Sequence, residues 1–385
     1  MHHDHMSAMT EATALTRAGR LDEATAVIQR ALSGRSAEPE GTVPGEVPRA
    51  DHRVDDEQSR HPGSGRRTRK SLRGLGSRLR ERLGRAVGTA SSRPRPPGVE
   101  TPPGEVTPVR PGETSVHVHR SPAGDRPYTL YVPTTGTGRR PLVVMLHGGT
   151  QTAEEFAAAT RMSALAQEHG FLVAYPEQVT SANAMRYWNW FQPADQQRDA
   201  GEPAIIAGII AEIAAAHAVD PDRVYIAGLS AGAAMAAVVA AAYPDVIAAV
   251  GVHSGLPRGS AHDAASGFAA MRQAPRAAPL GRPVPVIAFH GDADSTVAPD
   301  NATRVVEQFT GAPVSGETLV ERGSGRPATR TVVRRGRAVV GERWIVHGSG
   351  HAWSGGLAGA SYTDPDGPDA SAEMVRFFAE HPRHG

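Results

Sequence analysis

The stretch Gly228-Leu229-Ser230-Ala231-Gly232 places one serine between two glycines, where an apolar run meets an alanine-rich run. A G-x-S-x-G sequence between a strand and a helix is typical of a nucleophile elbow, whose strained backbone lifts the serine hydroxyl above the edge of a sheet. The helix that follows presents unpaired N–H groups, and that of Ala231 is available to an oxyanion. Ser230 is therefore the candidate nucleophile, and Ala231 is a candidate oxyanion donor.

A serine nucleophile needs a base, and the base needs an acid that orients it. With this elbow they follow in the chain order Ser, Asp, His, each on a loop after a later strand. "FHGDADSTV" offers Asp292 and Asp294, and "WIVHGSGHAWSGG" offers His347 and His351. We expect Asp294 as the acid and His351 as the base, because a glycine-rich loop frees His351 to reach the elbow, whereas His347 stands at a strand end. Each alone could equally be a loop carboxylate or a core histidine, but the required order favours a catalytic triad.

The stretch "LHGGTQT" follows an apolar run at residues 141–146. A glycine-rich turn at this place lets backbone N–H groups face the nucleophile, so we expect the second oxyanion donor to be Gly149 or its neighbour Thr150. Loss of one such donor typically lowers the rate ~100- to 1,000-fold. His147 is expected to brace this loop by hydrogen bonds rather than to act as a base.

Aromatic residues crowd into the polar segment "MRYWNWFQPADQQRDAGEPA" of a chain that has four tryptophans. Trp188, Trp190 and Phe191 there suit an apolar wall for an acyl group or a ring, and Trp353 could join the same wall. Ordinary packing of the loop is the alternative interpretation.

The composition argues against other chemistries. The chain has no cysteine, so it has neither a disulfide framework nor a thiolate metal site. The histidines at positions 2, 3 and 5 have no spaced carboxylate partner and read as a flexible tail, and no phosphate loop or dinucleotide fingerprint is present. We therefore expect neither a metal nor another cofactor. The 41 basic and 40 acidic residues nearly cancel, so bulk charge indicates no nucleic-acid partner.

Short, nearly continuous apolar runs are typical of parallel strands that helices cover on both faces. Such runs occupy residues 141–147, 171–176, 223–228, 246–253 and 284–290. An antiparallel hairpin, "SVHVHR" and "YTLYVP", precedes them. Helical patterns cover residues 152–169, 203–217, the segment after Ser230, and about 370–380. Strands that alternate with helices predict an α/β protein with a doubly wound, mostly parallel sheet, and the elbow makes it an α/β-hydrolase fold.

The first third of the chain differs from the rest in amino-acid composition and in predicted structure. Residues 1–33 are predicted to form a short helical hairpin, and residues 34–112 a largely disordered linker. Within that linker, residues 66–85 hold nine basic residues and one acidic residue. This basic segment could meet an anionic surface or a polymer granule, but its glycines favour a solvated linker. Residues 113–385 are the predicted catalytic domain.

Compartment signals in the sequence are mixed. The N-terminus has no basic region followed by an unbroken apolar stretch, so we identify no secretory signal. No apolar run approaches the ~20 residues of a membrane span. With the absence of cysteine, these features favour the cytoplasm.

Several longer stretches resemble the poly(3-hydroxybutyrate) depolymerase family of esterases, which is close to the feruloyl and acetylxylan esterases of carbohydrate esterase family 1. They include "PLVVMLHGGTQTAEEFAAATRMSALAQEHGFLVAYPEQ", "YWNWFQPADQQRDAGEPAIIAGII", "DPDRVYIAGLSAGAAMA", "GVHSGL", "HGDADSTV" and "GSGHAW". The resemblance covers about residues 113–380. It implies an extracellular-type esterase for short-chain polyhydroxyalkanoates, with Ser230, Asp294 and His351 as its triad.

One departure from the family concerns the oxyanion loop. Members usually carry cysteine where Gly149 stands, and often where Tyr187 stands, and these look like disulfide partners. Without them, packing alone must hold the loop.

The expected substrate is a short 3-hydroxyacyl polyester or its oligomers, and a feruloyl or acetyl ester on a polysaccharide is the alternative. A function of another class is an inactive hydrolase-fold binding protein, tethered through residues 66–85. A serine peptidase of the same fold is a third hypothesis, although no gating domain is evident.

Overall fold

The structure, a computed structural model, describes Val27, residues 112–320 and residues 325–383. The helical hairpin, the linker and the basic segment predicted before residue 113 lie outside these residues, apart from Val27 and Gly112, and they stay predictions. The strands are β1 (Glu113–His119), β2 (Arg126–Val132), β3 (Arg140–Leu146), β4 (Leu172–Pro176), β5 (Val219–Leu229), β6 (Ala249–His253), β7 (Val286–Gly291), β8 (Glu317–Val320), β9 (Ala328–Arg335), β10 (Ala338–Val346), β11 (Trp353–Ser354) and β12 (Thr363–Asp364). The helices are α3 (Ala153–Thr160), α4 (Met162–His169), η1 (Pro193–Gln196), α5 (Gly201–Ala216), α6 (Ala231–Ala242), α7 (Ala264–Arg272), α8 (Asp300–Thr310) and α9 (Ala370–Ala379).

Ten of the described strands form one sheet in the order β1-β2-β4-β3-β5-β6-β7-β10-β9-β8. From β4 to β10 all neighbouring strands are parallel, whereas β1, β2, β8 and β9 add antiparallel pairs at the two sides. The predicted antiparallel hairpin and the mostly parallel sheet are therefore confirmed. Because β3, β5, β6, β7 and β10 are parallel, their carboxyl ends meet at one edge, where loops can bring distant residues together.

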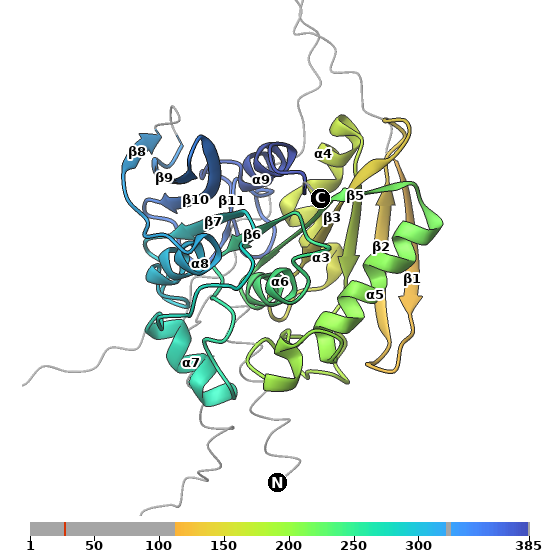
Figure 1. Ribbon diagram of the computed structural model, residues 1–385, viewed down its shortest axis with the longest axis horizontal. Coiled ribbons are helices and arrows are strands. Elements are labelled where there is room, and N and C mark those ends of the chain that lie inside the picture. The colour runs from red at the N-terminus through yellow and green to blue at the C-terminus, as the bar shows by residue number, and fades with distance from the viewer. Residues whose placement is uncertain (1–26, 28–111, 321–324, 384–385) are drawn as a thin grey trace, which may run out of the picture. The chain divides into compact units, whose positions relative to one another are not determined.

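Helices cover both faces of this sheet, which explains why its central strands are apolar without alternation. Along β3, Leu142, Val144 and Leu146 pack into the core that includes residues of α5, α6 and α8. Val143 and Met145 point the other way, into the core that includes residues of α3, α4 and α9. Figure 1 shows α5, α6 and α8 lying over one face of the sheet.

The helical pattern predicted from residue 152 to Gly170 is two helices in the structure. Thr152 and Glu155 form the predicted capping box at the start of α3. Arg161 then takes a left-handed backbone conformation, with φ of 54°, and separates α3 from α4. Its guanidinium donates to the carbonyl oxygen of Gly355 at 2.9 Å and to Asp369 at 3.2 Å, so distant contacts hold the break.

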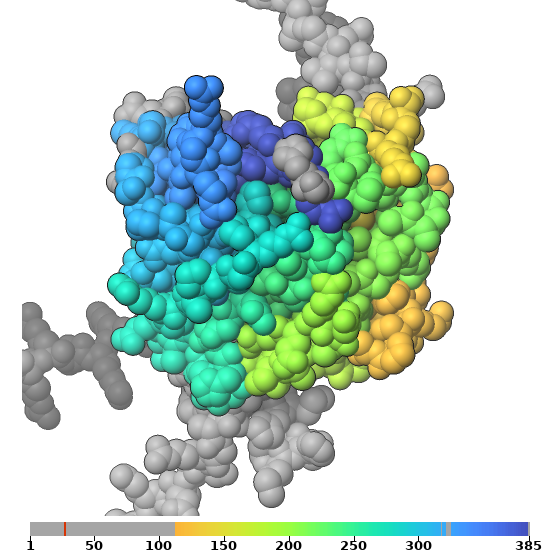
Figure 2. Space-filling model, in the orientation of Figure 1, coloured from red at the N-terminus to blue at the C-terminus, as the bar shows by residue number. Residues whose placement is uncertain are grey.

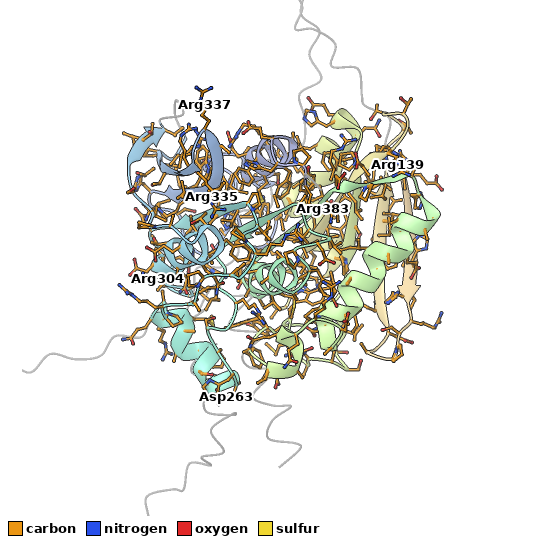
Figure 3. The ribbon with its side chains drawn as sticks, in the orientation of Figure 1. Arg139, Asp263, Arg304, Arg335, Arg337 and Arg383 are labelled. Carbon is orange, nitrogen blue, oxygen red and sulfur yellow. The ribbon has the colours of Figure 1, made fainter. Side chains whose placement is uncertain are left out.

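Charged side chains lie exposed at the periphery of the described chain. Figure 3 shows Arg139, Asp263 and Arg337 at the outer rim of the molecule, and all three are exposed. Figure 2 shows β1 and β2, in orange, reaching the surface at one side.

Among the described helices, none combines the length and the apolar composition that crossing a membrane requires.

Candidate active site

Ser230 occupies a strained turn between β5 and α6. Its φ of 55° and ψ of −118° lie outside the regions that a non-glycine residue ordinarily adopts. The N–H of Ser230 donates to the carbonyl oxygen of His253 at 2.9 Å, which ties the turn to the end of the neighbouring strand β6. The turn needs Gly232 at its far side, because a methyl group there would lie 2.2 Å from the carbonyl oxygen of Leu146. The predicted strand, sharp turn and helix are all present.

The two candidate acids and the two candidate bases form two separate pairs. Nδ1 of His351 lies 2.7 Å from Oδ2 of Asp294, and Nδ1 of His347 lies 2.8 Å from Oδ2 of Asp292. The side chains of the first pair are 6% and 0% exposed, whereas those of the second are 37% and 41% exposed. Only the first pair is therefore shielded from solvent, and the attraction between its members is stronger for that reason.

Further donors surround the carboxylate of Asp294. Its Oδ1 accepts from the N–H groups of Thr296 and Val297, both at 2.9 Å. Burial alone would raise the pKa of Asp294, but the imidazoles of His351 and His290 hold that pKa well below its usual range. Asp294 is therefore ionised at neutral pH, and it can orient His351 through Nδ1.

His290 is a polar residue of the site to which the sequence analysis gave no role. It is fully buried, and its Nε2 lies 3.2 Å from Oδ2 of Asp294 and 2.9 Å from the carbonyl oxygen of Val297. Both neighbours are acceptors, so Nε2 carries the proton. The position of His290 directly before the acid loop, in "FHGDAD", was a signal that could have identified it.

Ser230 and His351, the candidate nucleophile and the candidate base, have reactive atoms that are not engaged in hydrogen bonds. Among the described residues, no hydrogen bond joins the hydroxyl of Ser230 to Nε2 of His351, and neither atom has another hydrogen-bond partner. Since Nδ1 of His351 bonds to Asp294, Nε2 is the nitrogen left to accept a proton.

In the loop expected to bind the oxyanion, most backbone N–H groups already donate hydrogen bonds. The N–H of Gly148 donates to the side chain of Gln151 at 2.9 Å, and that of Thr150 donates to the carbonyl oxygen of Met185 at 2.9 Å. Within the described part of the chain, the N–H groups of Gly149 and Ala231 have no acceptor. Of the two expected alternatives, Gly149 and Thr150, Gly149 is thus the residue whose N–H group is available to an oxyanion.

His147 braces this loop from beneath, as its place in the sequence predicted. Its Nε2 accepts from the N–H of Gln178 at 3.0 Å, and its Nδ1 lies 2.7 Å from the carbonyl oxygen of Gly148. Burial lowers the pKa of His147 to about 4, so the imidazole is neutral at neutral pH. A neutral ring with both nitrogens engaged has no free atom for base catalysis.

The tryptophans expected to form a substrate wall are buried. Trp188 and Trp353 are 0% exposed and Trp190 is 5% exposed, whereas Phe191 is half-buried. Nε1 of Trp188 donates to the carbonyl oxygen of His147 at 3.1 Å. This corrects the expectation for Trp188 and Trp353, because side chains without exposed surface brace the core and cannot line an open wall.

Trp353 and Phe191 make different contacts. Trp353 stacks on His253 with 5.0 Å between ring centroids, and its Nε1 donates to Ser371 at 3.0 Å. Phe191 packs edge-to-face on Trp190 with 5.7 Å between centroids. Of the four aromatic residues expected to bind substrate, Phe191 keeps the most surface for a ligand.

Gly149 and Tyr187, the positions of the expected cysteines, are in contact. A methyl group on Gly149 would lie 2.2 Å from Cε1 of the Tyr187 ring. The ring therefore fills the space beside the glycine. The hydrogen bond from the N–H of Thr150 to the carbonyl oxygen of Met185 joins the same two segments, which corrects the expectation that packing alone holds the loop. Within residues 112–320 and 325–383, no group of three or more histidine, aspartate or glutamate side chains is arranged to hold a metal ion.

Residues 126–328, more than half of the 385-residue chain, match the family described as "Esterase PHB depolymerase". The chain belongs to this family. The matched stretch contains Ser230 and Asp294 and ends before His351. The predicted family resemblance is confirmed.

Curated relatives of this family member include enzymes that are named for different activities. Poly(3-hydroxyalkanoate) depolymerase C of Paucimonas lemoignei is 41% identical over 194 residues, which are 47% of this chain and 47% of that protein. Feruloyl esterase B of Neurospora crassa is 29% identical over 256 residues, which are 60% of this chain and 84% of that protein. The chain thus spans about half the length of the depolymerase.

A solved structure supports the fold. The acetyl xylan esterase from Aspergillus awamori superposes with a TM-score of 0.55 at 19% identity, covering 70% of this chain and 100% of that one. Together with the strand order and the turn at Ser230, this similarity confirms the predicted α/β-hydrolase fold.

Proposed function

We propose that this family member is a serine carboxylic-ester hydrolase with Ser230 as nucleophile, His351 as base and Asp294 as acid. The observation that carries the proposal is the buried pair of Asp294 and His351, on loops that follow parallel strands at the same sheet edge as the strained turn of Ser230. Membership of an esterase family supports the same reaction class.

The reaction follows from the free atoms of the site. Nε2 of His351 takes the proton of Ser230 as the serine oxygen attacks the ester carbonyl, and Asp294 stabilises the imidazolium that forms. The N–H groups of Gly149 and Ala231 receive the negative charge of the oxyanion. His351 then protonates the departing alkoxide, and a water that it activates releases the acyl group.

For the substrate, we propose a short 3-hydroxyacyl polyester or its oligomers. The 41% identity to a poly(3-hydroxyalkanoate) depolymerase supports this class. A feruloyl or acetyl ester on a polysaccharide is the second candidate, supported by the identity to feruloyl esterase B and by 27% identity over 211 residues to acetylxylan esterase A of Emericella nidulans. Hydrolysis rates on polyhydroxybutyrate suspension, its oligomers, methyl ferulate and acetylated xylan separate the two.

The first prediction concerns the nucleophile. Ser230→Ala should lower hydrolysis of p-nitrophenyl butyrate by at least about 10,000-fold while the fold persists, because only the hydroxyl forms the acyl-enzyme. Ser163→Ala, on α4, is the control with wild-type activity.

Covalent labelling provides an independent check. A fluorophosphonate should label the wild-type protein at Ser230 and leave the Ser230→Ala variant unlabelled. A wild-type protein that neither reacts with this probe nor cleaves esters would instead favour the inactive binding protein.

A further inference from the structure

Tyr187 lies in the segment between β4 and α5 that contacts the oxyanion loop, and hydrogen bonds fix its backbone on both sides. Its N–H donates to Oδ1 of Asn183 at 3.3 Å, and its carbonyl oxygen accepts from Nε2 of Gln178 at 2.9 Å. Two residues earlier, the carbonyl oxygen of Met185 accepts from the N–H of Thr150 at 2.9 Å. The backbone of Tyr187 is therefore held in register with the loop that contains Gly149.

The ring of Tyr187 lies directly beside Gly149. A methyl group on that glycine would lie 2.2 Å from Cε1, 2.5 Å from Cδ1 and 2.6 Å from Cζ. Because Cζ carries the hydroxyl group, the hydroxyl lies close to the same loop. Gly149 is also the residue of this loop whose N–H has no acceptor among the described residues.

The hydroxyl of Tyr187 is unusual among the seven tyrosines of the chain, all of which the structure describes. Five hydroxyls have a hydrogen-bond partner in the protein, namely those of Tyr128, Tyr131, Tyr175, Tyr243 and Tyr362. Tyr225 has a fully buried hydroxyl without a partner. Tyr187 has no partner among the described residues either, but it is only half-buried and its hydroxyl is not sealed in the core.

We propose that the hydroxyl of Tyr187 is a third hydrogen-bond donor to the oxyanion, beside the N–H groups of Gly149 and Ala231. The inference rests on the proposed function and adds a catalytic residue to that site. A tyrosine hydroxyl is among the side-chain donors that suit an oxyanion hole, provided that the ring is fixed in advance. The contact with Gly149 and the two backbone hydrogen bonds supply that fixation.

The proton inventory is simple. As the oxygen of Ser230 bonds to the acyl carbon, its proton moves to Nε2 of His351 and the carbonyl oxygen gains the negative charge. Tyr187 donates a hydrogen bond to that oxygen and keeps its own proton. Burial and the nearby Tyr362 raise the pKa of Tyr187 to about 12, so the phenol stays protonated at neutral pH.

The test is Tyr187→Phe, which removes the donor and keeps the ring against Gly149. We expect kcat for p-nitrophenyl butyrate to fall about 10- to 100-fold with KM within about twofold, because the donor acts on charge that develops only in the transition state. Inhibition by an alkyl trifluoromethyl ketone, which forms a tetrahedral oxyanion on the serine, should weaken by the same factor. A role in packing alone would leave both quantities unchanged.

Tyr225→Phe is the matched control, since it also removes an unpartnered hydroxyl, from the core on β5. It should keep wild-type kcat and ketone inhibition. A Tyr187→Phe protein with wild-type kcat and wild-type ketone inhibition overturns the inference and leaves the proposed function standing. A wild-type protein that cleaves no ester and resists fluorophosphonate overturns the proposed function itself, and the inference with it.

Discussion

At the scale of single residues, Asp294 differs from Asp292 in how completely its charge is compensated. Asp294 accepts from two backbone N–H groups and two imidazoles in a buried site. Asp292 accepts from His347 and from the N–H of Gly348, and its side chain is 41% exposed. Solvent weakens an exposed pair of this kind, so the second pair can link the two loops without controlling the base.

Replacing each aspartate in turn separates these roles. Asp294→Asn should lower kcat/KM for p-nitrophenyl butyrate about 1,000- to 10,000-fold, because the amide would favour the wrong tautomer of His351. Asp292→Asn should stay within about tenfold of the wild type, since its pair is screened by water. A larger loss in the second variant than in the first would reverse the assignment of the acid.

The sequence could predict residue types and their order, but not which carboxylate meets which imidazole. Asp292 and Asp294 are two residues apart, and both loops contain glycine. The pairing depends on backbone contacts between the loops, such as the N–H of Ala293 donating to the carbonyl oxygen of Ser349 at 3.0 Å. For the same reason, the burial of Trp188 and Trp353 could not be predicted from the polar sequence around them.

At the scale of elements, the start of α6 packs against the end of β3, and this contact joins the proposed nucleophile to the proposed oxyanion loop. Gly232→Ala would place a methyl group 2.2 Å from the carbonyl oxygen of Leu146 and 2.4 Å from that of His147. Because backbone atoms cannot rotate away, we expect the free energy of unfolding to fall by roughly 2 kcal/mol or more.

Urea unfolding measures this effect, and the surface offers a matched substitution. Gly281 has open space around its Cα and no left-handed φ, so Gly281→Ala should change the stability by less than about 0.5 kcal/mol. Equal stabilities of the two variants would show that α6 and β3 are not packed as described.

Element boundaries were predictable where local chemistry sets them. The capping box of Thr152 and Glu155 fixes the start of α3, and the apolar runs fix the central strands. The break at Arg161 was missed because Gly355 and Asp369, which hold it, lie about 200 residues away. Interactions over that distance leave no periodic signal in the sequence.

At the scale of the whole molecule, buried histidines link folding to pH. His147 has an ordinary pKa of 6.5 when unfolded and about 4 when folded, because burial disfavours the charged ring. Between pH 6.5 and pH 4, the unfolded chain therefore binds a proton at His147 and the folded protein does not. The contribution of the neutral His147 ring to the free energy of unfolding is complete above pH 6.5 and is lost as the pH falls towards 4. The largest loss is about 3 kcal/mol.

A histidine substitution tests this linkage. Denaturant unfolding of the wild type should show stability falling across this acidic range, and His147→Gln should show a smaller fall because the residue no longer titrates. His262→Gln, at an exposed position, should keep the wild-type slope. An unchanged slope in the His147→Gln variant would mean that this ring takes up its proton equally in the folded and the unfolded state, so that burial does not lower its pKa.

The architecture of the catalytic domain could be predicted from the sequence in more detail than its surface chemistry. Apolar runs and helical patterns sufficed for a doubly wound sheet because burial on both faces dictates composition. The hairpin at residues 1–33 and the basic segment at 66–85 stay predictions. The acyl group of the proposed substrate cannot be predicted from the sequence, because its fit depends on side-chain placement that composition and periodicity do not determine.

The contact between Gly149 and Tyr187 joins the proposed oxyanion loop to the neighbouring segment without sulfur. Such a clamp does not respond to redox potential: dithiothreitol cannot open it, and peroxide cannot tighten it. Since the 385 residues include no cysteine, one thiol introduced at an exposed site such as Arg337 would have no competitor for a spectroscopic label.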